Sequence, residues 1–167
     1  MKLGVFQFST DYAMPIGDLA REVEDRGFES LWIPEHTHIP TSRKTPFPGG
    51  TGLPQEYKHT LDPFVALSHA AACTSKLRLG TGICLVIQRD TITLAKEVAS
   101  LDLLSQGRFE LGIGGGWNQD EMENHGTEYK TRFSKMGEQV LAMKELWTKE
   151  EAEFHGDFVD FSPSWSW

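Results

Sequence analysis

Short apolar runs alternate with amphipathic stretches along the chain. The apolar runs have the length and composition of buried strands. They cover residues 2–8, 28–34, 77–85 and 108–113. In the stretches that follow, apolar residues recur at helical spacing. These stretches predict helices over residues 15–26, 63–74, 91–106 and 132–149. Four successive strand–helix units predict an α/β protein with parallel strands and right-handed crossovers.

Two architectures share this alternation, an open doubly wound sheet and a (β/α)8 barrel. A barrel takes about 250 residues, so under the barrel hypothesis residues 1–167 form a partial barrel of about four βα units. A short hairpin over residues 151–161, centred on Gly156, is expected to follow them. The Pro- and Gly-rich loop from 35 to 61 is longer than most loops of a compact domain, which predicts a functional or mobile segment.

Local signals also predict where one helix begins and which side of another helix is buried. Asp62 followed by Pro63 provides an N-cap acid and a proline in the first helical turn. The helix over residues 132–149 is expected to turn one apolar stripe inward. The stripe consists of Phe133, Met136, Val140, Met143 and Trp147.

Composition narrows the classes of partner. The formal net charge is −8, so the chain lacks the clustered positive charge of nucleic-acid-binding proteins and is disfavoured at an anionic membrane surface. No apolar run approaches transmembrane length. Cys73 and Cys84 are too few for a disulfide framework and favour a reducing compartment. We therefore expect a cytoplasmic protein that acts on a small molecule, without nucleic-acid or membrane partners.

The most informative stretch is Gly-Ile-Gly-Gly-Gly-Trp-Asn at 112–118, directly after the fourth predicted strand. Glycines let the backbone approach a ligand closely and direct N–H groups at an anion. The residues leave two interpretations open, a ligand-binding turn or a tight turn that simply needs small residues. As a dinucleotide fingerprint the stretch is weak, because it follows the fourth strand rather than the first.

His36 follows the second predicted strand, at the end that faces the active site in parallel sheets and barrels. A histidine there can exchange a proton with a substrate, or it can anchor the loop. Glu35, His36 and His38 are sequence neighbours that point to alternate sides, with no distant third ligand. We therefore expect no metal site.

Two glycines, one cysteine and an acidic cluster are interpreted by their roles in the fold. Gly80 and Gly82 interrupt the third strand and indicate a bulge, a close backbone approach, or packing against a helix. Cys84 has no neighbouring base and is expected to be a small buried hydrophobe. The cluster after the glycine turn is expected to be a solvated face. Its members are Asp120, Glu121, Glu123, His125 and Glu128.

Four stretches, in this order and spacing, resemble the luciferase-like monooxygenase superfamily, and most closely its branch that uses coenzyme F-420. They are Leu-Trp-Ile-Pro-Glu-His at 31–36, Leu-Arg-Leu-Gly-Thr-Gly-Ile at 77–83, Ala-Lys-Glu-Val-Ala-Ser-Leu-Asp at 95–102, and Ser-Gln-Gly-Arg-Phe-Glu-Leu-Gly-Ile-Gly-Gly-Gly-Trp-Asn at 105–118. The likeness spans nearly the whole chain, whereas family members continue well beyond it. It implies the N-terminal half of a (β/α)8 TIM barrel, with a cofactor at the C-terminal mouth.

The resemblance also implies the residues of a site. His36 is the implied catalytic residue, as a proton donor or hydrogen-bond partner near the reactive ring. The implied cofactor-binding residues are His36, Thr81, Gly82, Ile83, Gly114, Gly115, Gly116, Trp117 and Asn118. The implied cofactor is coenzyme F-420, a deazaflavin, with FMN as the alternative. A non-proline cis peptide bond is expected at Gly82–Ile83.

One departure from the family bears on the substrate. Some of its sugar-phosphate dehydrogenases have a catalytic glutamate just after the glycine turn, where this sequence has Trp117. The resemblance therefore does not extend to a sugar-phosphate substrate.

The leading function is hydride transfer between reduced coenzyme F-420 or FMN and an organic substrate. A half-barrel exposes two sheet edges and an apolar inner face, so we expect either a homodimer that completes the sheet or a fragment without full activity. One alternative function is a non-catalytic half-barrel that self-associates or complements a missing C-terminal half. Another is a nucleotide-binding doubly wound domain.

Overall fold

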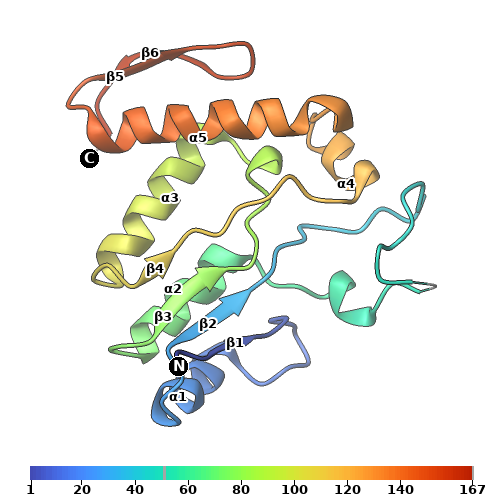
Figure 1. The fold of residues 1–167 in the computed structure, drawn as a ribbon, viewed down its shortest axis with the longest axis vertical. Coiled ribbons are helices and arrows are strands. Elements are labelled where there is room, and N and C mark those ends of the chain that lie inside the picture. Colours follow the sequence, from blue (N-terminus) through green and yellow to red (C-terminus); the bar gives the residue numbers. More distant parts are fainter. Residues whose placement is uncertain (51, 167) are drawn as a thin grey trace. The chain divides into compact units, whose positions relative to one another are not determined.

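The apolar runs form a parallel sheet with the strand order β1–β2–β3–β4 (Figure 1). Its strands are β1 (Gly4–Phe6), β2 (Ser30–Ile33), β3 (Arg78–Thr81) and β4 (Phe109–Glu110). The register sets Val5 opposite Leu31, Leu31 opposite Leu79, and Leu79 opposite Phe109. These apolar residues form a row across the sheet, and Leu31 and Leu79 are completely buried.

The computed structural model describes residues 1–50 and 52–166. They belong to two compact units. The first unit contains the sheet and comprises Met1–Ile39, Gly49–Cys84 and Ser100–Ile113. The second unit comprises Pro40–Pro48, Leu85–Ala99 and Gly114–Trp167.

Helices α1 (Ile16–Asp25) and α2 (Pro63–Cys73) pack against each other and against β2 and β3. The expected start of α2 is confirmed, because Asp62 Oδ1 accepts a hydrogen bond from the Val65 backbone N–H at 3.0 Å and Pro63 occupies the first turn. Phe64 and Leu67 of α2 are buried. The Phe64 ring lies 5.9 Å from that of Phe109.

Arg108, just before β4, joins the end of α2 to the sheet. Its guanidinium donates to the carbonyl oxygens of Ala71 at 3.0 Å and Leu77 at 2.9 Å, and to the Thr74 hydroxyl at 2.9 Å. Carbonyl groups at the end of a helix have no partner within the helix. One arginine therefore satisfies the end of α2 and fixes the connection to β3.

The opposite face of the sheet carries Trp32. Alternation along β2 directs this indole away from the side that buries Leu31 and Ile33. The ring lies over Gly80 of β3, where any side chain would overlap it. Gly80 is thus required by a close side chain on the neighbouring strand, and the alternative of packing against a helix is wrong.

The second unit holds most of the remaining elements. They are the 3-10 helix η2 (Val86–Gln88), α4 (Gln119–Asn124), the 3-10 helix η3 (Tyr129–Thr131), α5 (Arg132–Thr148), β5 (Ala152–His155) and β6 (Asp160–Ser164). Helix α3 (Thr91–Leu104) begins in this unit and ends in the first, and the 3-10 helix η1 (Gln55–Lys58) lies in the long loop of the first unit.

The expected inward stripe of α5 is only partly correct. Met143 is completely buried, but Phe133 is 57% exposed and Trp147 is 38% exposed. Gln139 is buried instead, because its Nε2 donates to the Arg89 carbonyl at 3.1 Å and to the Thr91 hydroxyl at 3.0 Å. Apolar spacing alone does not reveal a polar residue that fastens a helix to a neighbouring backbone.

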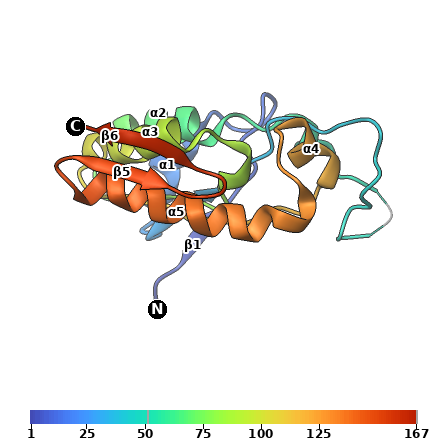
Figure 2. The ribbon, with the colours of Figure 1, turned by 90° about the horizontal axis from the view of Figure 1, so that it is seen from above.

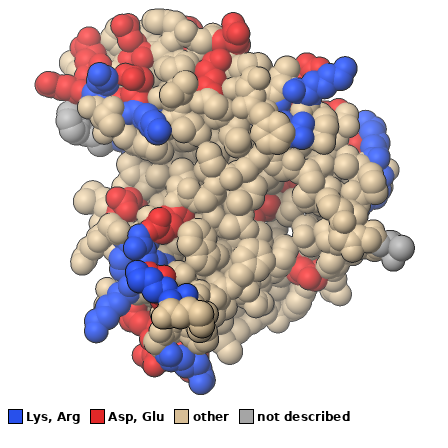
Figure 3. All heavy atoms as spheres, in the orientation of Figure 1, with Lys and Arg blue, Asp and Glu red and all other residues tan. Residues whose placement is uncertain are grey.

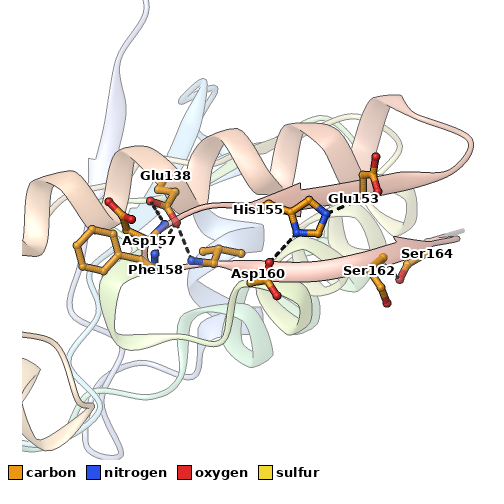
Figure 4. Close-up of polar contacts among 9 residues, drawn as sticks. Glu138, Glu153, His155, Asp157, Phe158, Asp160, Ser162 and Ser164 are labelled. Atoms are coloured by element: carbon orange, nitrogen blue, oxygen red, sulfur yellow. Dashed lines mark hydrogen bonds and ion pairs between the residues drawn. The ribbon is translucent and has the colours of Figure 1, made fainter.

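The strands β5 and β6 pair antiparallel and lie along α5 (Figure 2). The turn between them is held by Glu138 of α5 (Figure 4). Its carboxylate accepts hydrogen bonds from the backbone N–H groups of Asp157 at 3.1 Å, Phe158 at 2.6 Å and Val159 at 2.6 Å. A helix side chain thus satisfies turn groups that would otherwise need water.

Acidic side chains gather over this hairpin (Figure 3). The exposed ones are Glu150, Glu151, Glu153, Asp157 and Asp160. Within the cluster, His155 Nδ1 lies 2.6 Å from Asp160 Oδ1 (Figure 4). This hydrogen bond, with the negative charges of Asp160 and Glu153, raises the pKa of the His155 imidazole.

None of the helices in the described part of the chain is long and apolar enough to cross a membrane.

In the first unit, Glu24 of α1 holds the connection between α2 and β3. Its carboxylate accepts hydrogen bonds from the backbone N–H groups of Ser75 at 3.0 Å, Lys76 at 2.7 Å and Leu77 at 2.7 Å. Burial alone would raise the pKa of the Glu24 carboxyl. The hydrogen bonds from the backbone outweigh burial and lower that pKa.

Glu24→Gln tests this carboxylate because it removes the charge and keeps the shape. We expect the free energy of unfolding to fall by about 1 kcal/mol at neutral pH, after allowance for solvent screening of this partly exposed group. Because the folded-state pKa is lowered, the stabilisation exists above the unfolded-state pKa and is lost as pH falls through the folded-state pKa. Urea unfolding near neutrality and near pH ~3 measures the difference.

Glu22→Gln is the matched control. Glu22 lies on the same helix and pairs on the surface with Arg26 at 2.6 Å, so its loss is expected to change stability little. An equal loss for both variants, or no dependence on pH for Glu24→Gln, would contradict the role of Glu24.

Candidate functional site

In the first unit, the candidate site lies at the C-terminal ends of β2 and β3. The Gly82 N–H donates to the Ile33 carbonyl at 2.7 Å, which continues the pairing of β3 with β2. On the other side, Thr81 Oγ1 and the Cys84 N–H both donate to the Gly112 carbonyl, at 2.8 Å and 2.7 Å. Two backbone hydrogen bonds and one from a side chain therefore hold residues 81–84 on both sides. The Gly82–Ile83 peptide bond is cis, as expected.

His36 lies three residues beyond the end of β2 and is buried. Its backbone carbonyl accepts a hydrogen bond from the Thr60 hydroxyl at 2.6 Å. This bond fixes the segment that carries the imidazole, because it joins the two ends of the long loop. The His36 ring centroid lies 5.0 Å from that of Tyr57.

Tyr57 belongs to a row of aromatic rings that the sequence did not reveal. Its ring lies 4.8 Å from Phe8, which lies 5.9 Å from Phe6 at nearly a right angle. A Cβ built on Gly82 would stand 3.3 Å from the Phe6 ring. The row therefore runs from His36 to the backbone that follows β3. Burial, together with the charge of Glu56, raises the pKa of the Tyr57 phenol, which favours its protonated, donor form.

Thr81, Gly82 and Ile83 differ in their accessibility. Thr81 is completely buried and serves the sheet through its hydroxyl, whereas Ile83 is 37% exposed. Cys84 is completely buried, which confirms the expectation of a small hydrophobe. Gly82 and Ile83 are thus the residues of this stretch that are open to a ligand.

In the second unit, residues 114–118 connect to α4. Gly116 has φ +64, a conformation that favours glycine, and a Cβ there would stand 3.0 Å from Leu85 Cδ2. A Cβ on Gly115 would stand 2.8 Å from the Phe133 ring. Both positions need a minimal side chain for packing. The interpretation of residues 114–116 as a tight turn that needs small residues is therefore correct for Gly115 and Gly116.

Trp117 and Asn118 complete the turn. The Trp117 ring lies 5.7 Å from Phe47 of the long loop. Asn118 is 4% exposed, and its carbonyl accepts a hydrogen bond from the Met122 N–H at 3.2 Å. Of the predicted site residues, His36 and 81–83 thus lie in the first unit and 114–118 lie in the second.

The prediction of a solvated acidic face after the turn is wrong for two residues. Asp120 is 5% exposed and Glu121 is completely buried, whereas Glu123 is exposed. Asp120 is buried because its Oδ2 accepts a hydrogen bond from the Lys44 N–H at 2.7 Å, and Lys44 Nζ lies 3.7 Å from its Oδ1. Within the described ranges, no group of three or more His, Cys, Asp and Glu side chains could hold a metal ion.

Comparison with known proteins identifies the class. The model of the luciferase-like monooxygenase family matches residues 1–165. The chain belongs to this family.

Two relatives show what share of a family member's length this chain covers. An uncharacterized protein of Mycobacterium tuberculosis is 45% identical over 170 residues, which cover 100% of this chain and 60% of that protein. An F-420-dependent glucose-6-phosphate dehydrogenase of Kineococcus radiotolerans is 30% identical over 165 residues, which cover 96% of this chain and 45% of the enzyme. The chain thus spans about half the length of the relatives that it matches.

Solved structures of other proteins share the fold of this chain over about half of their own length. A monooxygenase from Streptomyces bottropensis has a TM-score of 0.82 and 27% identity, covering 99% of this chain and 49% of its own. An oxygenating component of a Pseudomonas putida monooxygenase in complex with FMN has a TM-score of 0.77, covers 98% of this chain and 43% of its own, and at 20% identity shares the fold alone. The prediction of the N-terminal half of a (β/α)8 barrel is confirmed.

The glycine turn allows a test of packing against backbone conformation. Gly126 has φ +74 with nothing near its Cβ position, whereas Gly116 has φ +64 and the Leu85 contact. We expect Gly126→Ala to destabilise by about 1 kcal/mol through its positive φ. Gly116→Ala should cost about 1 kcal/mol more, because buried Leu85 must shift. Equal losses in urea unfolding would show that the turn is not tightly packed.

Proposed function

We propose that this chain is the N-terminal half of an oxidoreductase that transfers a hydride between coenzyme F-420 and an organic substrate, with FMN as the alternative cofactor. The family match and the F-420-dependent relative support the reaction class. The observation that carries the proposal is the aromatic row from His36 to Phe6, which ends beside Gly82. A ring system needs such a wall together with a close approach of backbone.

These residues fit a planar cofactor ring. Gly82 lacks a Cβ at a position that Phe6 closely borders, and Ile83 is partly exposed beside it. We propose that Thr81–Ile83 support one face of the ring and that His36 donates a hydrogen bond or a proton at its edge. When bound, the deazaflavin would supply the hydride, and FMN would in addition allow chemistry with oxygen.

The glycine turn is proposed to serve the polar part of the cofactor. Gly114–Gly116, Trp117 and Asn118 would bind near the ring and the ribityl-phosphate side. Trp117 has no carboxylate, so the proposed substrate is not a sugar phosphate, unlike that of the glucose-6-phosphate dehydrogenase relative. Cys73 and Cys84 are not joined in a disulfide, and a reducing cytoplasm is the proposed location.

Cofactor titration tests the proposal. Oxidised coenzyme F-420 and FMN are added separately and binding is followed by fluorescence, with coenzyme F-420 expected to bind more tightly. His36→Gln should weaken binding of the preferred cofactor about tenfold, as expected for loss of one hydrogen bond and a ring contact. His38→Gln is the control, because His38 is exposed. The proposal fails if neither cofactor binds, or if both variants behave alike.

The open edge of the sheet supports a second candidate, self-association. β1 has a partner strand only on its β2 side among the described strands, and Leu3, which precedes it, is 51% exposed. A cavity of about 750 Å³ lies beside β1. Its lining mixes apolar residues, such as Val5, Leu19 and Phe28, with charged residues of α1. Exposed strand edges and apolar patches favour pairing with another chain. We propose a homodimer in which this edge is covered.

Light scattering tests the dimer, with an expected mass twice the 18.8 kDa of the chain. Leu3→Lys places a charge at the exposed start of this edge and should shift the mass toward the monomer. Val65→Lys, on the exposed side of α2 at 72% exposure, should leave the mass unchanged. A wild-type protein that is monomeric at high concentration would contradict the homodimer.

A further inference from the structure

A segment of the long loop, Pro40–Pro48, is fastened to the chain that follows the glycine turn, all within the second unit. Thr45 Oγ1 accepts a hydrogen bond from the Gln119 N–H at 3.0 Å. The Lys44 N–H donates to Asp120 at 2.7 Å, and Phe47 meets Trp117 edge to face. These contacts fix the loop from Lys44 to Phe47, directly after Arg43.

Two carboxylates of this region, Asp120 and Glu123, form ion pairs with Lys44, although Asp120 Oδ1 has no hydrogen-bond partner. Lys44 Nζ lies 3.7 Å from Asp120 Oδ1 and 3.6 Å from Glu123 Oε2. Glu123 also accepts a hydrogen bond from Gln119 Nε2 at 2.5 Å. One lysine thus serves two carboxylates, and neither is bound by the neighbouring arginine.

Arg43 is left with a positive charge and an unsatisfied donor. Its guanidinium carbon lies 6.0 Å from the centre of the Trp117 ring, within cation–π distance. Its Nη1 is buried without a hydrogen-bond partner, and among the residues that the structure describes no carboxylate pairs with it. A buried N–H without an acceptor is costly, and more so on a charged group. The site therefore calls for an acceptor.

We propose that Arg43, supported on the Trp117 ring, binds an oxyanion, a phosphate or carboxylate group of a small molecule. A guanidinium presents a planar fork of donors that matches the two oxygens of such a group, which lysine does not. The inference deepens the proposed function and rests on it for the source of the anion, which is either the cofactor or the substrate. It assigns specificity to a loop residue outside the sequence motifs.

Paired ligands identify the source of the anion. FMN is compared with riboflavin, and coenzyme F-420 with its phosphate-free deazaflavin chromophore, by fluorescence titration. Inorganic phosphate and acetate are titrated separately, with tryptophan fluorescence as the readout and Trp117→Phe to assign the signal. If Arg43 binds a phosphate of the cofactor, Arg43→Gln should weaken binding of the phosphate-bearing cofactor about tenfold. Binding of the phosphate-free compound should then be unchanged. A substrate anion predicts loss of the phosphate or acetate response alone.

Three further variants sharpen the result. Arg21→Gln, which removes an exposed arginine paired with Asp18 in the first unit, should change nothing. Arg43→Lys should bind anions more weakly than wild type, because it keeps the charge and loses the fork. Trp117→Glu should abolish anion binding, because its carboxylate would pair with Arg43.

Failure of this inference differs from failure of the proposed function. If no cofactor binds but phosphate or acetate still depends on Arg43, the proposed function fails and the anion site stands. If the cofactors bind and Arg43→Gln changes neither the paired ligands nor the response to phosphate and acetate, the anion site is overturned.

Discussion

The hydrogen bonds around the Gly112 carbonyl are the constraint on which the candidate site depends. This one oxygen accepts from the Thr81 hydroxyl and from the Cys84 N–H, while Gly82 donates to Ile33 on the other side. The chain between 81 and 84 is therefore held at both ends as it leaves the strand. Gly82 is thereby fixed beside Phe6, and the aromatic row meets backbone there rather than another side chain.

Both units secure their connections by the same physical means. Glu24 in the first unit and Glu138 in the second each direct a helix carboxylate at three successive backbone N–H groups. A charged acceptor satisfies donors that a turn cannot pair internally, and such bonds are stronger than neutral ones. Arg108 in turn donates hydrogen bonds to backbone carbonyl groups at and after the end of α2. The segments between elements are thus fixed by long polar side chains, and the apolar core need not reach them.

The sequence predicted the order and type of the main elements because the signals are local. Asp62 and Pro63 begin α2 where expected, and the parallel strands fall within the predicted apolar runs. It did not predict that α5 buries Gln139 or that Asp120 is buried, because both depend on backbone groups far away in the chain. Burial of a polar side chain is decided by its partner, and spacing along one helix does not contain that partner.

The sequence by itself determined the order of the strands and helices, since apolar periodicity is a property of neighbouring residues. Its motifs, through their resemblance to a known family, also determined the family and the half-barrel. Only the tertiary structure decided which side chains surround the segments of the candidate site. Tyr57 meets His36 and Phe8, and Arg43 meets Trp117, through a long loop whose course no periodic pattern specifies. Such contacts arise when distant segments pack together, because ring stacking and charge pairing depend on distance in space and not on distance along the chain.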